Sequence, residues 1–104
     1  MKLNVLERIT LMGILPASEN YVTYKIITEF KAALSFSEEE IKDFEMVVEK
    51  DQVNWNPTKA REKEFVIGES LAKIIGSALK KADEEKKIDD ANASLYEKFV
   101  LTIN

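Results

Sequence analysis

The sequence predicts an α+β fold in which four to five helices pack on a small antiparallel three-stranded meander. Two observations predict this class. Apolar residues recur at helical spacing in several segments, most clearly from about Glu69 to Ala82. Between residues 44 and 67 the apolar period changes to two, which is typical of strands. The length of 104 residues predicts a single domain, 1–104.

The first third of the chain predicts two helices. Apolar residues lie mostly at helical spacing from Lys2 to Met12, and Gly13 is expected to end this first helix. Pro16 keeps the residue before it out of helical geometry, so a new helix has to start afterwards. Ser18 is the expected N-cap of that second helix, which runs from about Glu19 to Leu34.

A short helix and a hairpin are expected next. Ser37 and Glu40 have the spacing of a capping box, in which each side chain binds the other's backbone amide. Alternating apolar residues over 44–48 and again over 53–55 then predict a β-hairpin. Its turn is expected at Lys50-Asp51, although this pair is a weaker turn signal than Asn-Gly.

The third strand of the meander is expected at Glu64–Ile67, because Pro57 ends the second strand and a polar loop follows it. A competing interpretation is one continuous helix from Pro57 to Ala82. We disfavour that helix because Phe65, Val66 and Ile67 are poor helix formers in a row and a glycine follows them.

Two helices complete the predicted fold. The helix from about Glu69 to Ala82 has an unbroken apolar stripe, and Glu69 stands four residues before Lys73 as a supporting ion pair. The last helix is expected to be capped by Asp89 or Asp90. Its apolar face carries Leu95, Phe99 and Ile103.

Composition excludes several function classes. The chain has no His and no Cys, which excludes a Ser-His-Asp triad, a cysteine nucleophile, a disulfide and a thiolate or imidazole zinc site built from this chain. The net charge of −4 and the presence of only two arginines, Arg8 and Arg61, argue against nucleic-acid binding. The N-terminal residues mix charges into their apolar stretch, so we expect neither a signal peptide nor a membrane span.

No catalytic, cofactor or metal site is predicted. Ser70 and Lys73 have the S-x-x-K spacing of serine acyltransferases, but the supporting motifs are absent. Clustered carboxylates occur, for example over 38–40 and 83–85, without the alternation and central glycine of a calcium loop. We interpret them as helix-start acids and solvated turns, and expect a protein without enzymatic activity or cofactor.

Aromatic residues are the candidate interaction residues. Trp55 lies on the second strand of the predicted hairpin, and Tyr21 and Tyr24 open the second helix. Trp and Tyr are the side chains that most often anchor protein interfaces. The alternative for Trp55, which we favour, is a core position beside Phe44 and Phe65, because a small sheet normally hides one face.

Three segments resemble small proteins encoded by phages and prophages. They are Leu3-Asn4-Val5-Leu6-Glu7-Arg8 with Gly13-Ile14-Leu15-Pro16, then Leu34-Ser35-Phe36-Ser37-Glu38-Glu39-Glu40, and near the end Ser94-Leu95-Tyr96-Glu97-Lys98-Phe99. The resemblance implies a phage or prophage setting. It implies no activity and no catalytic residue, because no activity is known for that group.

These observations lead to one functional expectation and two alternatives. We expect a non-enzymatic interaction module in the cytoplasm of a bacterial host, acting by self-assembly or by binding a host or virion protein, with no nucleic-acid or membrane partner. The first alternative is an acidic inhibitor that imitates the phosphates of nucleic acid. The second is a carboxylate- or metal-dependent enzyme, which would need a pocket with converging acids.

Overall fold

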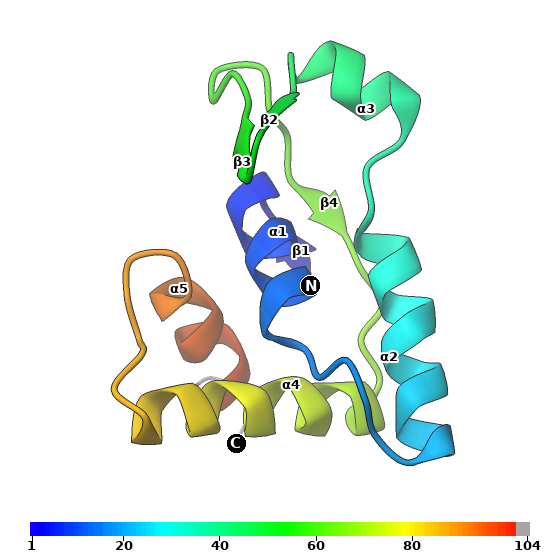
Figure 1. Ribbon diagram of the computed structural model, residues 1–104, viewed down its shortest axis with the longest axis vertical. Helices are drawn as coiled ribbons and strands as arrows, with labels where there is room; N and C mark the ends of the chain where they lie inside the picture. The colour runs from blue at the N-terminus through cyan, green and yellow to red at the C-terminus, as the bar shows by residue number, and fades with distance from the viewer. Residues whose placement is uncertain (102–104) are drawn as a thin grey trace.

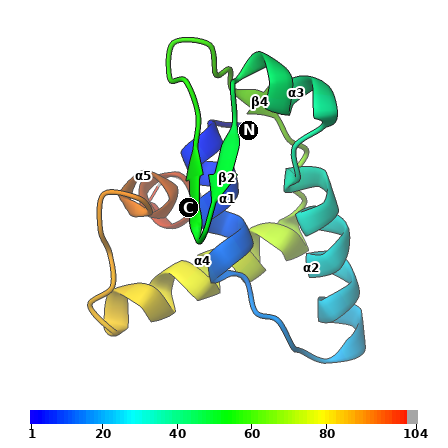
Figure 2. The same ribbon diagram turned by 45° about the horizontal axis from the view of Figure 1, so that its top comes forward.

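The computed structural model describes residues 1–101 as a mixture of helices and short antiparallel strands, which confirms the α+β class (Figure 1). The elements in chain order are β1 (Lys2–Leu3), α1 (Val5–Ile14), α2 (Tyr21–Leu34), α3 (Glu38–Asp43), β2 (Val47–Glu49), β3 (Gln52–Asn54), β4 (Lys63–Glu64), α4 (Glu69–Glu84) and α5 (Ala93–Tyr96), which continues as a π-helical turn over Glu97–Leu101. Helix α4 crosses one end of the molecule, while the β2–β3 hairpin and α3 lie at the other (Figures 1 and 2).

The predicted bounds of the first helix are wrong at both ends. Lys2 and Leu3 form β1, and the helix begins after Asn4, whose side chain accepts from the Glu7 amide at 2.8 Å in a capping box. Gly13 lies within the last turn, and α1 ends at Ile14. Leu15, the residue before Pro16, is extended and ends the helix as expected of a residue in that position.

The next two helices follow their predicted places with one change of cap. Helix α2 begins after Asn20, whose side chain accepts from the Thr23 amide at 3.0 Å, so Ser18 is not the N-cap. Helix α3 begins after Ser37, and the predicted capping box is confirmed. The Glu40 amide donates to Ser37 Oγ and the Ser37 amide donates to Glu40 Oε1, both at 3.0 Å.

The three-stranded meander is wrong, although its hairpin is confirmed. Strands β2 and β3 pair across the Lys50-Asp51 turn, with Val48 opposite Val53. The third strand is only β4, and it pairs antiparallel with β1 at the N-terminus instead of with β3. The segment that contains Pro57 carries the chain away from the hairpin, so residues 1–101 form two separate two-stranded sheets.

The C-terminal helices agree with the predicted stripe. Helix α4 covers its predicted range and buries Ile75 and Leu79. The N-cap of α5 is Asn92, so the predicted cap at Asp89 or Asp90 is wrong. The Asp89 carboxylate instead accepts from the Ala91 amide at 2.9 Å, within the turn before the helix. Leu95 and Phe99 are buried as predicted, whereas Ile103 lies outside the described residues.

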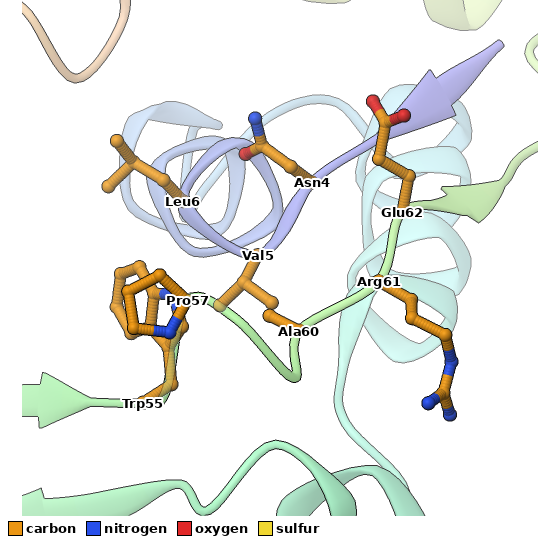
Figure 3. A pocket seen from close by; sticks show the side chains of 8 residues that line it. All are labelled: Asn4, Val5, Leu6, Trp55, Pro57, Ala60, Arg61 and Glu62. Atoms are coloured by element: carbon orange, nitrogen blue, oxygen red, sulfur yellow. The ribbon is translucent and has the colours of Figure 1, made fainter.

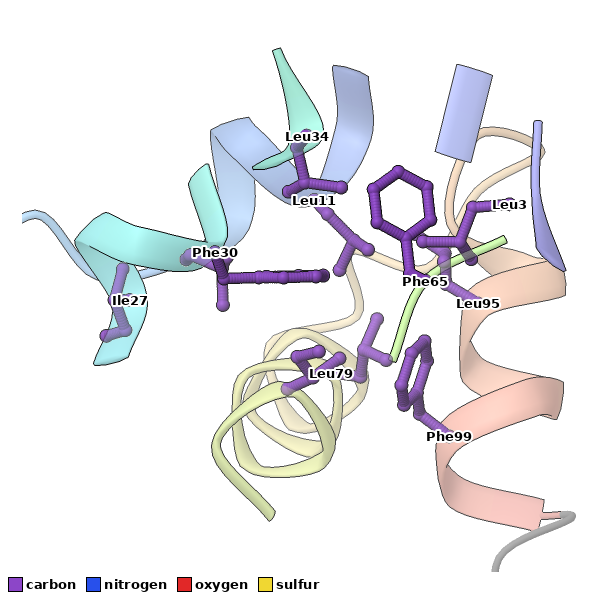
Figure 4. Packing of buried hydrophobic residues seen from close by; sticks show 11 residues of the cluster. Leu3, Leu11, Ile27, Phe30, Leu34, Phe65, Leu79, Leu95 and Phe99 are labelled. Atoms are coloured by element: carbon purple, nitrogen blue, oxygen red, sulfur yellow. The ribbon is translucent and has the colours of Figure 1, made fainter. Parts of the chain in front are cut away.

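One apolar core joins the helices to the two ends of the chain (Figure 4). At its centre the rings of Phe30 and Phe65 meet edge to face, with centroids 6.1 Å apart. Phe65 directly follows β4, so the β1–β4 pair holds this ring over α2 and α4. The core is built from Leu3, Leu11, Leu15, Ile27, Phe30, Leu34, Phe65, Ile75, Leu79, Leu95 and Phe99.

Candidate functional site

Trp55 is not one of the residues of this core, so the favoured prediction of a core position beside Phe44 and Phe65 is wrong. The indole is half-buried at the base of the hairpin, directly after β3. It lines an open pocket of about 240 Å³ between the hairpin base and the start of α1 (Figure 3). The other residues lining the pocket are Asn4, Val5, Leu6, Pro57, Ala60, Arg61 and Glu62.

The hairpin presents a second group of apolar side chains next to this pocket. Val48 and Val53 are register partners, so their side chains share one face of the hairpin, and Trp55 follows Val53 by two residues on the same side of the chain. Leu6, 40% exposed, completes the group from α1 across the pocket. We refer to Val48, Val53, Trp55 and Leu6 as the hairpin surface.

The hairpin surface is accessible to solvent because the two strands of the hairpin pack mainly against each other. Val48 is 72% exposed, and every residue of β2 is exposed. Strands β2 and β3 make their main contacts with each other. A two-stranded hairpin with both faces in water is marginal on its own, and large apolar side chains add no stability at such exposed positions.

Polar contacts hold the base of the hairpin in place. The Asn56 amide side chain donates to Glu45 Oε1 at 2.7 Å, and Lys59 Nζ donates to Glu45 Oε2 at 3.0 Å. These two contacts hold the pKa of the Glu45 carboxyl below its ordinary value. The backbone N–H of Asn56 also donates to the Phe44 carbonyl at 2.8 Å. The hairpin therefore leaves the body of the protein from a defined base.

The two predicted tyrosines lie elsewhere. Tyr21 is 74% exposed and Tyr24 is also exposed, both at the N-terminal end of α2. That end of α2 is beside α4, at the opposite end of the molecule from the hairpin (Figures 1 and 2). The structure therefore does not bring Tyr21 and Tyr24 together with Trp55, and the three residues do not form one surface.

The most deeply buried charged side chain among residues 1–101 is Arg8, one of the two arginines whose scarcity argues against nucleic-acid binding. Arg8 is fully buried, donates to the Leu34 carbonyl at 3.1 Å and the Ser35 carbonyl at 2.8 Å, and forms an ion pair with Glu40 at 2.7 Å. The guanidinium stacks over the Phe36 ring at 3.9 Å. The hydrogen bond from Arg8 lowers the pKa of Glu40 to about 2, against the opposing effect of burial. Arg8 thus joins α1 to the α2–α3 connection.

Glu7 makes a second buried charged contact. Its side chain is 1% exposed and accepts from Lys98 Nζ at 2.9 Å, from the Asn4 amide at 2.9 Å and from Ser94 Oγ at 3.0 Å. Both carboxylate oxygens of Glu7 accept hydrogen bonds within the protein, so we interpret this cluster as a structural link between α1 and the C-terminal helix. The sequence signal for both links is the adjacent pair Glu7 and Arg8 within an apolar helix.

Three further hollows are lined by residues of the described part of the chain. One, of about 630 Å³, lies between α4 and the C-terminal helix, and Lys73 and Lys80 stand on its rim. Two more share Pro16, Ala78 and Lys81 along another side of α4. Over residues 1–101, no group of three acidic side chains is placed to hold a metal ion, and no helix is long and apolar enough to cross a membrane.

Comparison with models of known protein families, with curated proteins and with solved structures finds no match to this chain.

Proposed function

We propose that this chain is a non-enzymatic protein-interaction module that binds its partner through the hairpin surface. The observation that supports the proposal is the exposure of Val48, with Val53 and Trp55 beside it, on a hairpin whose two strands contact mainly each other. Contiguous apolar side chains on a projecting element mark interaction sites more often than they serve the fold. Trp55, half-buried beside a pocket, has the placement of an interface anchor.

The proposal also includes a biological setting, which is a phage or prophage in a bacterial host. A phage or prophage origin, implied by the resemblance of three sequence segments, makes a second copy, a host protein or a virion protein the partner, in the cytoplasm of a bacterial host. The proposal assigns no cofactor, nucleic acid or membrane.

The two alternatives receive no support from particular residues. An acidic inhibitor needs carboxylates free to meet a basic groove, but Glu40, in the densest acidic cluster, is bound to Arg8, and Asp43 lies 3.5 Å from Arg61. An enzyme needs converging groups in a cleft. The pocket beside Trp55 contains one acid and one arginine, Glu62 and Arg61, and both are exposed.

Affinity capture with a matched pair of variants tests the proposal. Val48→Lys places a charge on the hairpin surface, and Val22→Lys places the same charge on α2 at a valine that is 68% exposed, away from the hairpin. Both variants are expected to fold, as checked by circular dichroism, because neither side chain is in the core. Proteins captured from a bacterial lysate by the wild type and by Val22→Lys should be lost with Val48→Lys.

Two results would contradict this function. Capture of the same proteins by Val48→Lys would place the binding surface elsewhere. A wild-type chain that captures nothing and remains a monomer by light scattering at every protein and salt concentration would remove the interaction module altogether.

A further inference from the structure

We infer that the partner at the hairpin is a second copy of this chain, which adds its β2 strand edge to edge and antiparallel around a two-fold axis at Val48. This inference rests on the proposed function and deepens it, because it names the occupant and its register. The backbone of the hairpin supports this inference independently of the apolar side chains.

The hairpin leaves the backbone groups of Val48 unused. The two-residue turn Lys50-Asp51 makes Glu49 and Gln52 the hydrogen-bonded pair that closes the hairpin. The next pair, Val48 and Val53, is then a non-hydrogen-bonded pair whose N–H and C=O groups point outward. An outward N–H and C=O on an edge strand form a template for a further strand, which presents the complementary groups at the matching spacing.

Of the two edges, β2 is the accessible one. All three residues of β2 are exposed, whereas Val53 on β3 is half-buried. Val47 and Val48 are 49% and 72% exposed on opposite faces of the hairpin. A strand added to β2 would therefore find apolar side chains on both of its sides.

A second copy fits this edge in one register. With the two-fold axis at Val48, each Val48 donates to and accepts from Val48 of the second copy, and Val47 lies opposite Glu49 of the second copy. No like charges lie directly opposite each other across residues 47–49 in this register. A two-fold pairing also uses the same residues on both sides, as a closed dimer requires.

The dimer would convert two marginal hairpins into one four-stranded sheet, in the order β3–β2–β2–β3. The side chains of Val53 and Val48 from both copies would form a continuous apolar row on one face. Three or more strands with an apolar face are what a small sheet needs for stability. The strand edge is only three residues long, so we expect weak association, with a Kd of roughly 0.1 mM.

Single cysteines test the register directly, because the full chain contains no cysteine. In the proposed dimer the Val48 Cα atoms are about 5.5 Å apart, within the range that a disulfide spans. The two Val47 Cα atoms are more than about 7 Å apart, beyond that range. Under mild oxidation Val48→Cys should cross-link at least 10-fold faster than Val47→Cys alone, and a mixture of Val47→Cys with Glu49→Cys should give the mixed dimer.

A second measurement separates backbone pairing from simple apolar contact. Val48→Pro removes the outward N–H without breaking a hydrogen bond of the hairpin, and Val48→Thr keeps it. By sedimentation at up to about 1 mM, we expect the wild type and Val48→Thr to approach twice the monomer mass of 11.9 kDa, and Val48→Pro to stay monomeric.

The outcomes separate this inference from the proposed function. Equal cross-linking of Val48→Cys and Val47→Cys, or a Val48→Pro dimer, overturns strand pairing at Val48. A wild-type chain that is monomeric at every concentration, but captures another protein through a Val48-dependent contact, overturns the second copy as occupant and leaves the interaction module in place. A monomer that captures nothing overturns both.

Discussion

Two helices of this protein end with a residue other than glycine in the left-handed region. Lys86 (φ 60°) follows α4 and Glu45 (φ 55°) follows α3. After α4 the Lys87 amide donates to the Ala82 carbonyl at 2.8 Å, and the Lys86 amide donates to the Asp83 carbonyl at 3.0 Å. This is the Schellman pattern, in which glycine is normally preferred because a Cβ strains the left-handed conformation.

Lys86→Gly should therefore stabilise the protein. The substitution removes the strain that the Cβ causes in the left-handed conformation. Glycine also raises the conformational entropy of the unfolded chain, which offsets part of this stabilisation. We therefore expect a net increase of about 0.5 kcal/mol in the free energy of unfolding. Chemical denaturation measures it. The control is Lys87→Gly, one residue later and outside the left-handed region, which should lower stability slightly. A loss of stability in Lys86→Gly would contradict the cap geometry.

The ion pair between Arg8 and Glu40 should make stability depend on acid. The folded pKa of Glu40 is about 2, below its ordinary value of 4.5, so between these values the unfolded chain binds more protons than the folded one. The contribution, on the order of 2–3 kcal/mol, is complete above about pH 5 and is lost as the pH falls towards 2.

Glu40→Gln tests this assignment. The variant keeps the size of the side chain and cannot ionise, so denaturation curves between pH 5 and pH 2 should flatten relative to the wild type. Glu39→Gln, an exposed neighbour in the same acidic run, is the matched control and should keep the wild-type slope. An equal slope in Glu40→Gln and the wild type would show that other carboxylates govern the acid response.

The N-cap of α2 determines where this helix begins. Asn20, not Ser18, is bound to the first turn of α2, through the Thr23 amide at 3.0 Å. Asn20→Ala should therefore lower the free energy of unfolding by about 1 kcal/mol, whereas Ser18→Ala should change it by a few tenths at most. Thermal unfolding of the two variants distinguishes them. The reverse order would place the start of α2 two residues earlier.

The elements that the sequence predicts well are those set by neighbours in the chain. The α4 stripe, the Ser37–Glu40 capping box and the Lys50-Asp51 hairpin each depend on residues within about four positions of one another, and all three are confirmed. Strand β1 depends on β4, which pairs with it from some 60 residues away, so local spacing gave no sign of it. Lys2 and Leu3 instead fit the helical pattern of α1.

The same distinction applies to the candidate site. Trp55 could be singled out by residue type, because an indole anchors interfaces more often than other side chains do. Its placement beside Leu6 depends on how the hairpin base meets α1, which no local pattern encodes. The hairpin surface was missed because Val48 and Val53 read as ordinary strand residues. Among the described residues no third strand pairs with this hairpin, and Val48 is left 72% exposed while Val53 is half-buried.

At the scale of the whole molecule, the two ends of the chain hold each other in the core. Leu3 and Phe99 belong to the same apolar cluster. Lys98 reaches across from the C-terminal helix, with Nζ 2.9 Å from Glu7 Oε1 and 3.0 Å from the Lys2 carbonyl oxygen. These contacts join residues more than 90 positions apart, so α1 and the C-terminal helix hold each other in place through long-range contacts.

The Glu7–Lys98 pair supplies a prediction about this docking. Lys98→Met leaves the Glu7 carboxylate buried without its cation, so we expect a loss of about 3 kcal/mol in the free energy of unfolding. Glu7→Gln removes the charge but keeps an acceptor for the Asn4 amide. The double variant should therefore be more stable than Lys98→Met alone, because it removes the uncompensated buried charge. Chemical denaturation of the four proteins gives the coupling.

The sign of that coupling decides what the pair does. If the two losses simply add, Lys98 contributes only packing and its bond to the Lys2 carbonyl, and the link between the chain ends is apolar. If Glu7→Gln rescues Lys98→Met, the cation holds a buried carboxylate in place. Amide exchange in the C-terminal helix should then be faster in Lys98→Met than in the double variant, because docking of this helix depends on keeping that charge paired.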